Sequence, residues 1–119
     1  MKASDLIGRV EELFPQMQST RRHIHTNPEL SFQEFETSKF IQGRLSELGI
    51  EHSVLAETGV VGHVGKGDKC VALRADIDAL PIHEETGLEY ASKNDGVMHA
   101  CGHDTHTTML LTAAQVLKE

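Results

Sequence analysis

The segment from His99 to His106 holds the densest supply of metal-binding side chains in the chain, with three histidines, one cysteine and one aspartate in eight residues. If the backbone is extended here, side chains two residues apart share a face, so His99, Cys101 and His103 point the same way. Thiolate and imidazole groups on one face suit zinc or another first-row cation. The alternative is a histidine-rich loop that contains a buried, reduced cysteine.

Two carboxylates, Asp76 and Asp78, follow an apolar run that predicts a strand over residues 70–75. An unpaired carboxylate in a buried segment is costly, so each aspartate needs a partner. Ligands gather beyond the carboxyl ends of strands in open α/β sheets, and a metal-binding histidine usually donates its second N–H to a carboxylate. We therefore expect these aspartates near the metal-binding segment. The alternative is that they cap the turn before Pro81.

Three blocks of sequence follow one another in a fixed order: RRHIHTNPELSFQE (21–34), ALRADIDALPI (72–82) and MHACGHDTH (98–106). Together they resemble the zinc-peptidase-like amidohydrolases of peptidase family M20, the aminoacylase and carboxypeptidase family. The branch that they resemble most is that of the N-acyl-amino-acid, hippurate and auxin-conjugate hydrolases. The resemblance covers the chain from about residue 20 to its end. It implies an α/β fold, the N-terminal part of a zinc-peptidase-like catalytic domain.

The resemblance also implies roles for individual residues. Cys101 and His103 match metal ligands, and Asp78 matches the catalytic carboxylate that orients a metal-bound group. Asp76 falls where other branches of the family carry a histidine ligand. The complete site would hold two divalent cations, with zinc or manganese expected and cobalt or nickel as alternatives. Four residues are candidates for the surroundings of the ligands: Asp76, Asp104, His99 and His106.

Members of the family continue beyond the metal-binding segment, with an adjacent glutamate pair, later histidine ligands and an inserted dimerisation domain. We therefore expect residues 1–119 to be a truncated, N-terminal portion of the catalytic domain, without the dimerisation domain. Two ligands are fewer than the three or so that a catalytic zinc uses. The complete protein is expected to be a homo-oligomer that cleaves the amide bond of N-acyl amino acids or related small amides, and this chain alone to be inactive.

Two other interpretations stay open. One is a self-contained metal-binding module without catalysis, and the other is an inactive fragment that buries a sheet edge in a partner. The acidic pair Glu84-Glu85 precedes the metal-binding segment, so it does not match the family's catalytic pair and is predicted to lie in a solvated loop. His25 is expected to have a structural role and to bond a backbone carbonyl, and the alternative is that it approaches the active site. Arg21 and Arg22 are expected to stabilise the helix dipole, and the alternative is that they bind a carboxylate.

Composition limits the classes of function. The formal net charge of −7 argues against nucleic acid as a partner, because phosphates require a basic surface. No apolar run is long enough for a membrane span, and the first residues lack the apolar core of a signal peptide. We therefore expect a cytoplasmic protein with two reduced cysteines, which binds no membrane.

Apolar periodicity predicts a first helix over residues 4–25, kinked or split at Pro15. Ser31 and Glu34 form the pattern of a capping box, which predicts that a second helix begins there and ends at Gly49. These two helices precede the strands in the chain.

The strands are expected to belong to a mixed sheet. A long loop is expected over residues 83–100, and loops of this length are often functional. A last helix would follow, with Asp104 or Thr105 as its N-cap. Three short strands are predicted: 51–56, 60–65 and 70–75.

Overall fold

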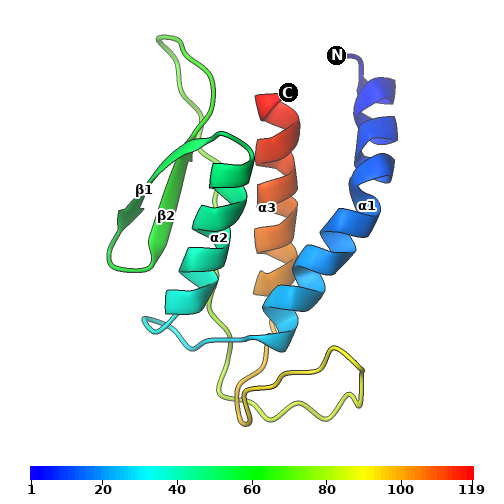
Figure 1. Ribbon diagram of the computed structural model, residues 1–119, viewed down its shortest axis with the longest axis vertical. Helices are drawn as coiled ribbons and strands as arrows, with labels where there is room; N and C mark the ends of the chain where they lie inside the picture. Colours follow the sequence, from blue (N-terminus) through cyan, green and yellow to red (C-terminus); the bar gives the residue numbers. More distant parts are fainter.

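The computed structural model describes residues 1–119 and combines three helices with a two-stranded sheet (Figure 1). In Figure 1, α3 lies between α1 and α2, and the strands lie on the other side of α2. The order of helices and strands along the chain is the one expected, apart from the missing third strand. The elements are α1 (Ala3–Thr26), α2 (Phe35–Glu47), β1 (Glu51–Leu55), β2 (Gly59–His63) and α3 (His103–Lys118).

Helix α1 runs through Pro15 without interruption, and its ribbon bends near the middle (Figure 1). The expected kink is therefore present, and the helix is not split. The buried side chains Leu13, Thr20 and Ile24 are spaced seven and four residues apart, so they share the stripe that packs on the other helices. The helix ends at Thr26, just before Asn27 and Pro28, because proline disfavours helical backbone in the residue before it.

Helix α2 begins without the capping box that the sequence predicts. Ser31 lies in a turn outside the helix. The carboxylate of Glu34 accepts hydrogen bonds from the Phe32 N–H at 2.9 Å and from the Thr58 hydroxyl at 2.8 Å, so it ties α2 to the turn between β1 and β2. The predicted pairing was wrong because Glu34 has these other donors.

Glu29 takes over the role of the cap. One of its carboxylate oxygens accepts the N–H of Thr37 at 2.5 Å and the hydroxyl of the same residue at 2.6 Å, and the other accepts the N–H of Glu36 at 3.1 Å. These amides belong to the first helical turn and have no carbonyl partner within the helix. At the other end Gly49 has a φ of +65°, and it ends the helix as predicted.

Strands β1 and β2 form an antiparallel hairpin, in which Glu51 pairs with His63 and Leu55 with Gly59. The third strand predicted at 70–75 is not formed, and the sheet is not mixed. A strand needs a neighbour for its backbone hydrogen bonds, and no strand pairs with this segment. Its side chains are open to solvent, and that of Val71 is 90% exposed.

The hydrophobic core is aliphatic and lies between α2, α3 and the hairpin. Ile41, Leu45, Ile50 and Leu111 form it. Gly62 of β2 lies so close to this core that a Cβ there would come within 3.4 Å of side-chain carbons of α2 and of the residue before β1. The close approach keeps the hairpin against α2.

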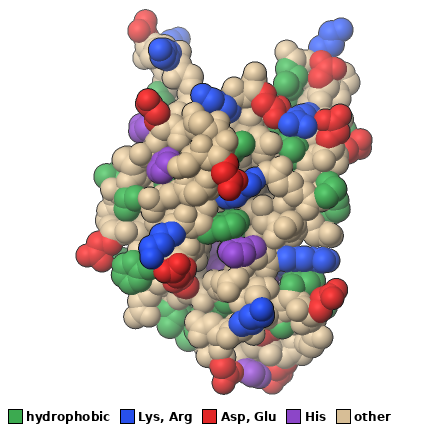
Figure 2. Space-filling view, in the orientation of Figure 1, with side chains coloured by type: hydrophobic (Ala, Val, Ile, Leu, Met, Phe, Trp, Pro, Cys, Tyr) green, Lys and Arg blue, Asp and Glu red, His purple; other side chains and the backbone are tan.

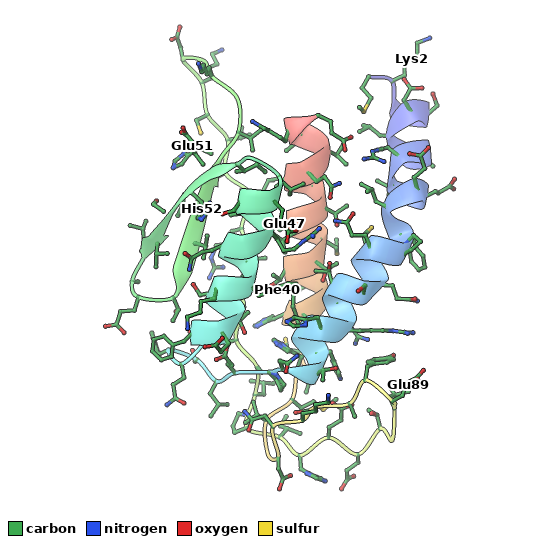
Figure 3. All side chains as sticks on the ribbon, in the orientation of Figure 1. Lys2, Phe40, Glu47, Glu51, His52 and Glu89 are labelled. Atoms are coloured by element: carbon green, nitrogen blue, oxygen red, sulfur yellow. The ribbon has the colours of Figure 1, made fainter.

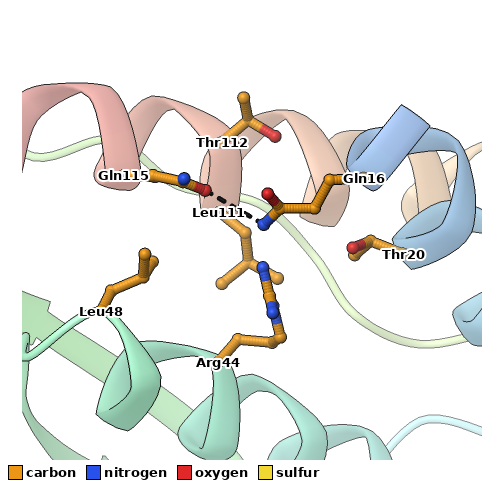
Figure 4. Close-up of a pocket in the computed structure, with 7 residues that line it drawn as sticks. All are labelled: Gln16, Thr20, Arg44, Leu48, Leu111, Thr112 and Gln115. Carbon is orange, nitrogen blue, oxygen red and sulfur yellow. Dashed lines mark hydrogen bonds between the residues drawn. The ribbon is translucent and has the colours of Figure 1, made fainter. Parts of the chain in front are cut away.

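Polar and aromatic contacts join α1 to the other helices. The side-chain amide of Gln16 donates to the side-chain carbonyl of Gln115 at 3.1 Å, across the small pocket of Figure 4. The imidazole ring of His23 stacks on Phe40, with ring centroids 4.3 Å apart; Figure 3 labels Phe40 on α2. The charged side chains on the face in Figure 2 are of both signs and interspersed. No helix combines the length and the apolar character that a membrane crossing requires.

Candidate metal-binding site

Two isolated backbone bridges bring the three sequence blocks together. Leu30 pairs with Ala79 in parallel, and Leu80 pairs with Met98 in antiparallel orientation. In the second bridge each N–H donates to the other residue's carbonyl at 2.9 Å. The segment that carries the two aspartates therefore lies beside the histidine-rich segment, as expected from the sequence.

His103, the first residue of α3, contacts Asp78 through one ring nitrogen. Its Nδ1 lies 2.9 Å from the Asp78 carbonyl oxygen and 3.0 Å from a carboxylate oxygen of the same residue. Both acceptors require that Nδ1 carries a proton, so Nε2 is the ring nitrogen that can offer a lone pair. This is the arrangement that metal-binding histidines usually have. Thr107 fixes the same segment, because its hydroxyl donates to the Asp76 carbonyl at 3.1 Å.

The extended backbone expected for the metal-binding segment is not formed. Gly102 has a φ of +108° and is the N-cap of α3, so the chain turns directly after Cys101. His99 is buried, the Cys101 thiol is exposed and His103 is partly buried, so the three do not share one open face. No three His, Cys, Asp or Glu side chains converge as a metal site would require.

His99 is enclosed without a partner. Neither ring nitrogen has a hydrogen-bond partner, although both are buried. Burial lowers the pKa of His99 below its ordinary value, and the nearby carboxylate of Asp104 opposes this effect only in part. The ring is therefore held neutral. Buried polar atoms without a partner are rare in proteins, and they mark a place where a ligand can act.

Neither Asp104 nor Thr105 is the N-cap of α3, contrary to the prediction. The carboxylate of Asp104 is fully buried and lies against α1. One oxygen is 2.8 Å from Nδ1 of His25 and 2.9 Å from Nε of Arg21, an ion pair between helices. Arg21 therefore pairs with a buried carboxylate, in place of the dipole role expected from the sequence.

His25 binds two carboxylates, and the prediction that it bonds a backbone carbonyl was wrong. Its Nδ1 faces Asp104, and its Nε2 lies 2.9 Å from Oε1 of Glu84. The side chains of His25 and Glu84 are each only 3% exposed. Glu84 is therefore not solvated, whereas its neighbour Glu85 is exposed as predicted. The prediction failed for Glu84 because its buried partner, His25, lies 59 residues away in the chain.

Hydrogen bonds keep Glu84 ionised in its buried position. Burial alone would raise the pKa of this carboxyl group, but the Thr86 hydroxyl, the Ser92 N–H and the His25 ring bond to it. Together these donors outweigh the burial and lower the pKa of Glu84 below its ordinary value. The loop from 84 to 92 thus closes on itself around one carboxylate.

Two of the other candidate residues lie at the surface. Asp76 pairs with Arg74 at 2.5 Å, and both side chains are exposed. His106 is exposed, with its ring centroid 6.1 Å from that of His103. Neither cysteine is in a disulfide. The structure therefore brings Asp78, His99 and His103 into one region and leaves Asp76 and His106 at its edge.

Known proteins match this chain over the same segments. The family model described as peptidase family M20/M25/M40 matches residues 72–119, which contain the aspartate and histidine segments. A dinuclear metal-binding peptidase of the M20 family from Bacillus subtilis superposes with a TM-score of 0.85 at 46% identity, covering 91% of this chain and 32% of that one. The chain belongs to peptidase family M20.

Curated relatives agree with this membership. An IAA-amino acid hydrolase of Arabidopsis thaliana is 52% identical over 95% of the M20 chain. An N-acetyl-L-cysteine deacetylase of Bacillus subtilis is 55% identical over 87% of it. A putative aminohydrolase from methicillin-resistant Staphylococcus aureus superposes with a TM-score of 0.93 at 42% identity, over 98% of this chain and 32% of that one. The M20 chain spans 26% of the length of each of these two curated relatives.

This M20 chain has side chains of the types that bind a divalent cation, but too few of them for a complete site. Cys101 supplies an exposed thiol, and His103 supplies a ring nitrogen that no protein group occupies. Thiolate and imidazole are the donors that zinc prefers. No third donor converges on them, so these residues do not form a complete site by themselves.

Proposed function

We propose that this chain supplies two ligands to the metal site of an amidohydrolase, an enzyme that cleaves the amide bond of N-acyl amino acids or related small amides. The observation that carries the proposal is the contact between Asp78 and His103. It makes Nδ1 the donor to Asp78 and leaves Nε2 as the ring atom available to a cation.

In this proposal Cys101 and His103 bind a divalent cation, zinc or manganese. Such a cation, when bound, lowers the pKa of a water molecule toward neutrality and polarises the amide carbonyl. Asp78 holds the His103 ring in the required tautomer and orientation, since its carboxylate and its carbonyl both accept from Nδ1. His99, buried and neutral, lines the same region.

The chain alone is proposed to be inactive. A catalytic zinc uses about three protein ligands and an open position, and only two donors are available here. A hydrolase also needs a general base within reach of the attacking water. Glu84, the most buried glutamate of the loop, is already engaged by three donors and does not fill this role.

The proposed substrate class rests on the relatives. Their names describe an N-acetyl-L-cysteine deacetylase, a hippurate hydrolase of Campylobacter jejuni and an IAA-amino acid hydrolase. The substrate in each name is an amide between an acyl group and an amino acid. A small N-acyl amino acid is therefore the substrate class that we propose for the protein to which these residues contribute.

A chimera tests the proposal directly. The part of the Bacillus subtilis deacetylase that aligns with this chain, 107 residues at 55% identity, is replaced by the corresponding residues of this chain. We expect the chimera to release acetate from N-acetyl-L-cysteine, and we expect the 119-residue chain alone to be no faster than a buffer with the same metal.

Variants of the chimera then assign the roles. Cys101→Ser and His103→Asn should each abolish metal-dependent turnover, whereas His52→Ala, in the hairpin, should leave it unchanged. A folded chimera that is inactive, or one in which Cys101→Ser is fully active, contradicts the proposal. Turnover by the 119-residue chain alone, abolished by a chelator, would contradict the claim that its site is partial.

A further inference from the structure

Four ionisable side chains form a closed cluster beside the proposed ligands. Arg21 and His25 come from the last turns of α1, Asp104 from the first turn of α3 and Glu84 from the long loop. The carboxylates of Asp104 and Glu84 are almost fully buried. Nothing in the proposed reaction uses these groups, so their burial needs another explanation.

His25 is the centre of the cluster. Its two ring nitrogens lie 2.8 and 2.9 Å from oxygens of two different carboxylates. A nitrogen without a proton would present its lone pair to a carboxylate oxygen, which is repulsive. Two ionised carboxylates therefore favour a ring that donates from both nitrogens.

Charged groups from three segments surround the ring. Asp104 faces it from α3 and Glu84 from the loop, and both carboxylates favour a cation here, whereas Arg21 of the same helix carries a like charge and shares Asp104 with the ring. The ring of Tyr90 packs edge-on, with centroids 5.8 Å apart.

The cluster joins the three segments that surround the ligand segment. Arg22 lies over the Tyr90 ring at 4.5 Å, and the Thr26 hydroxyl donates to the Tyr90 carbonyl at 2.9 Å. The Lys93 N–H donates to the Thr26 carbonyl at 2.9 Å. Asp104 directly follows His103 in the chain, so whatever fixes the carboxylate of Asp104 also fixes the start of α3.

We propose that His25 is a positioning residue: as an imidazolium between Asp104 and Glu84, it clamps the loop 84–92 and the start of α3 to α1, and so sets the position of His103. The clamp stands on its own contacts, and only its effect on metal binding rests on the proposed function. Loss of the His25 contacts should make the loop and the start of α3 more mobile together.

Hydrogen exchange in His25→Gln tests the clamp without metal. A glutamine cannot donate to both carboxylates from the ring positions. The amides of Ser92 and Lys93 in the loop, and that of Thr105 in α3, should exchange about ten to a hundred times faster, the loss expected for a charged hydrogen bond. Amides of the hairpin should not change. Glu85→Gln, at the exposed neighbour of Glu84, is the matched control.

A second variant separates the charge from simple packing. If His25 acts as a cation, removing it leaves Glu84 as an uncompensated buried anion, which Glu84→Gln should relieve. The double variant should therefore be less destabilised, and exchange more slowly at Ser92, than the two single variants would give by addition. If His25→Gln fails to fold, Glu84→Gln alone must still speed exchange at Ser92 and Lys93.

Zinc binding supplies the third measurement. His25→Gln should weaken zinc binding to the chain by roughly tenfold, as groups behind metal-binding histidines often do. Unchanged exchange at the loop, or strictly additive effects in the double variant, would overturn the clamp. If the wild-type chain binds no zinc, the proposed function fails, whereas exchange and the double variant still decide whether the clamp exists.

Discussion

Nδ1 of His103 lies 3.0 Å from the carboxylate of Asp78, and 25 residues separate the two in the chain. The bridge between Leu80 and Met98 brings them together, because it aligns the segments that carry them. The contact leaves Nε2 of the ring as the available ligand atom. It is the feature on which the proposed metal site depends.

Asp78→Asn should weaken zinc binding to the chain by about 10- to 100-fold, because the carboxylate orients the ring and raises its basicity. Isothermal calorimetry on the wild type and the variant measures the change. Asp76→Asn is the matched control, since that carboxylate is exposed and pairs with Arg74. An equal loss of zinc affinity in both variants would show that Asp78 has no specific role in orienting the His103 ring.

The start of α2 offers a test of stability that does not involve metal. Glu29→Ala should lower the free energy of unfolding by about 1–2 kcal/mol, because its carboxylate caps the amides of Glu36 and Thr37. Ser31→Ala should change it by no more than about 0.5 kcal/mol. Urea denaturation of both variants measures the difference. A larger loss of stability in Ser31→Ala than in Glu29→Ala would support the capping box that the sequence predicts.

Glu84 should make the chain sensitive to acid. The folded state lowers the pKa of this carboxyl group below its ordinary value of 4.5, so its stabilising contribution is fully present above that pH. The contribution is lost as the pH falls through the lower, folded pKa, because the unfolded chain then binds more protons. The stability gap between the wild type and Glu84→Gln should therefore shrink below pH 4.5, as denaturation curves at several pH values would show. A gap independent of pH contradicts this, and Glu85→Gln serves as the control.

The exposed apolar residues around the missing third strand should promote association. Val71 is 90% and Leu73 59% exposed, in a segment that pairs with no strand. We expect concentration-dependent self-association in sedimentation at micromolar concentrations, reduced in Val71→Ser and Leu73→Ser. Leu6→Ser, at an exposed position of α1, is the control. A compact monomer that binds no hydrophobic dye would rule this out.

Much of the fold could be predicted from local patterns. The apolar periodicity located α1, and Gly49 marked the end of α2, since these signals depend on neighbouring residues alone. The strand predicted at 70–75 failed because a strand depends on a partner that the local sequence does not reveal. Local signals also proposed Ser31 and Asp104 as caps, and tertiary contacts overrode both.

The candidate site could also be predicted only in part from the sequence. The nearness of Asp78 and His103 followed from the chemistry of metal-binding histidines, although the strand expected before Asp76 is not formed. The charge cluster was missed, because its members come from three distant segments and only their burial shows that they are paired. One available signal was the spacing of Arg21 and His25, which are four residues apart and so share a helix face.

Cobalt titration of the wild-type chain tests whether Cys101 and His103 bind metal, since a thiolate bound to Co²⁺ gives a charge-transfer absorption band. We expect a weak but saturable band, which Cys101→Ser abolishes, His103→Asn weakens markedly and Cys70→Ser leaves intact. A band that survives Cys101→Ser, or that Cys70→Ser removes, would contradict the assignment of Cys101 and His103 as the metal ligands of this chain.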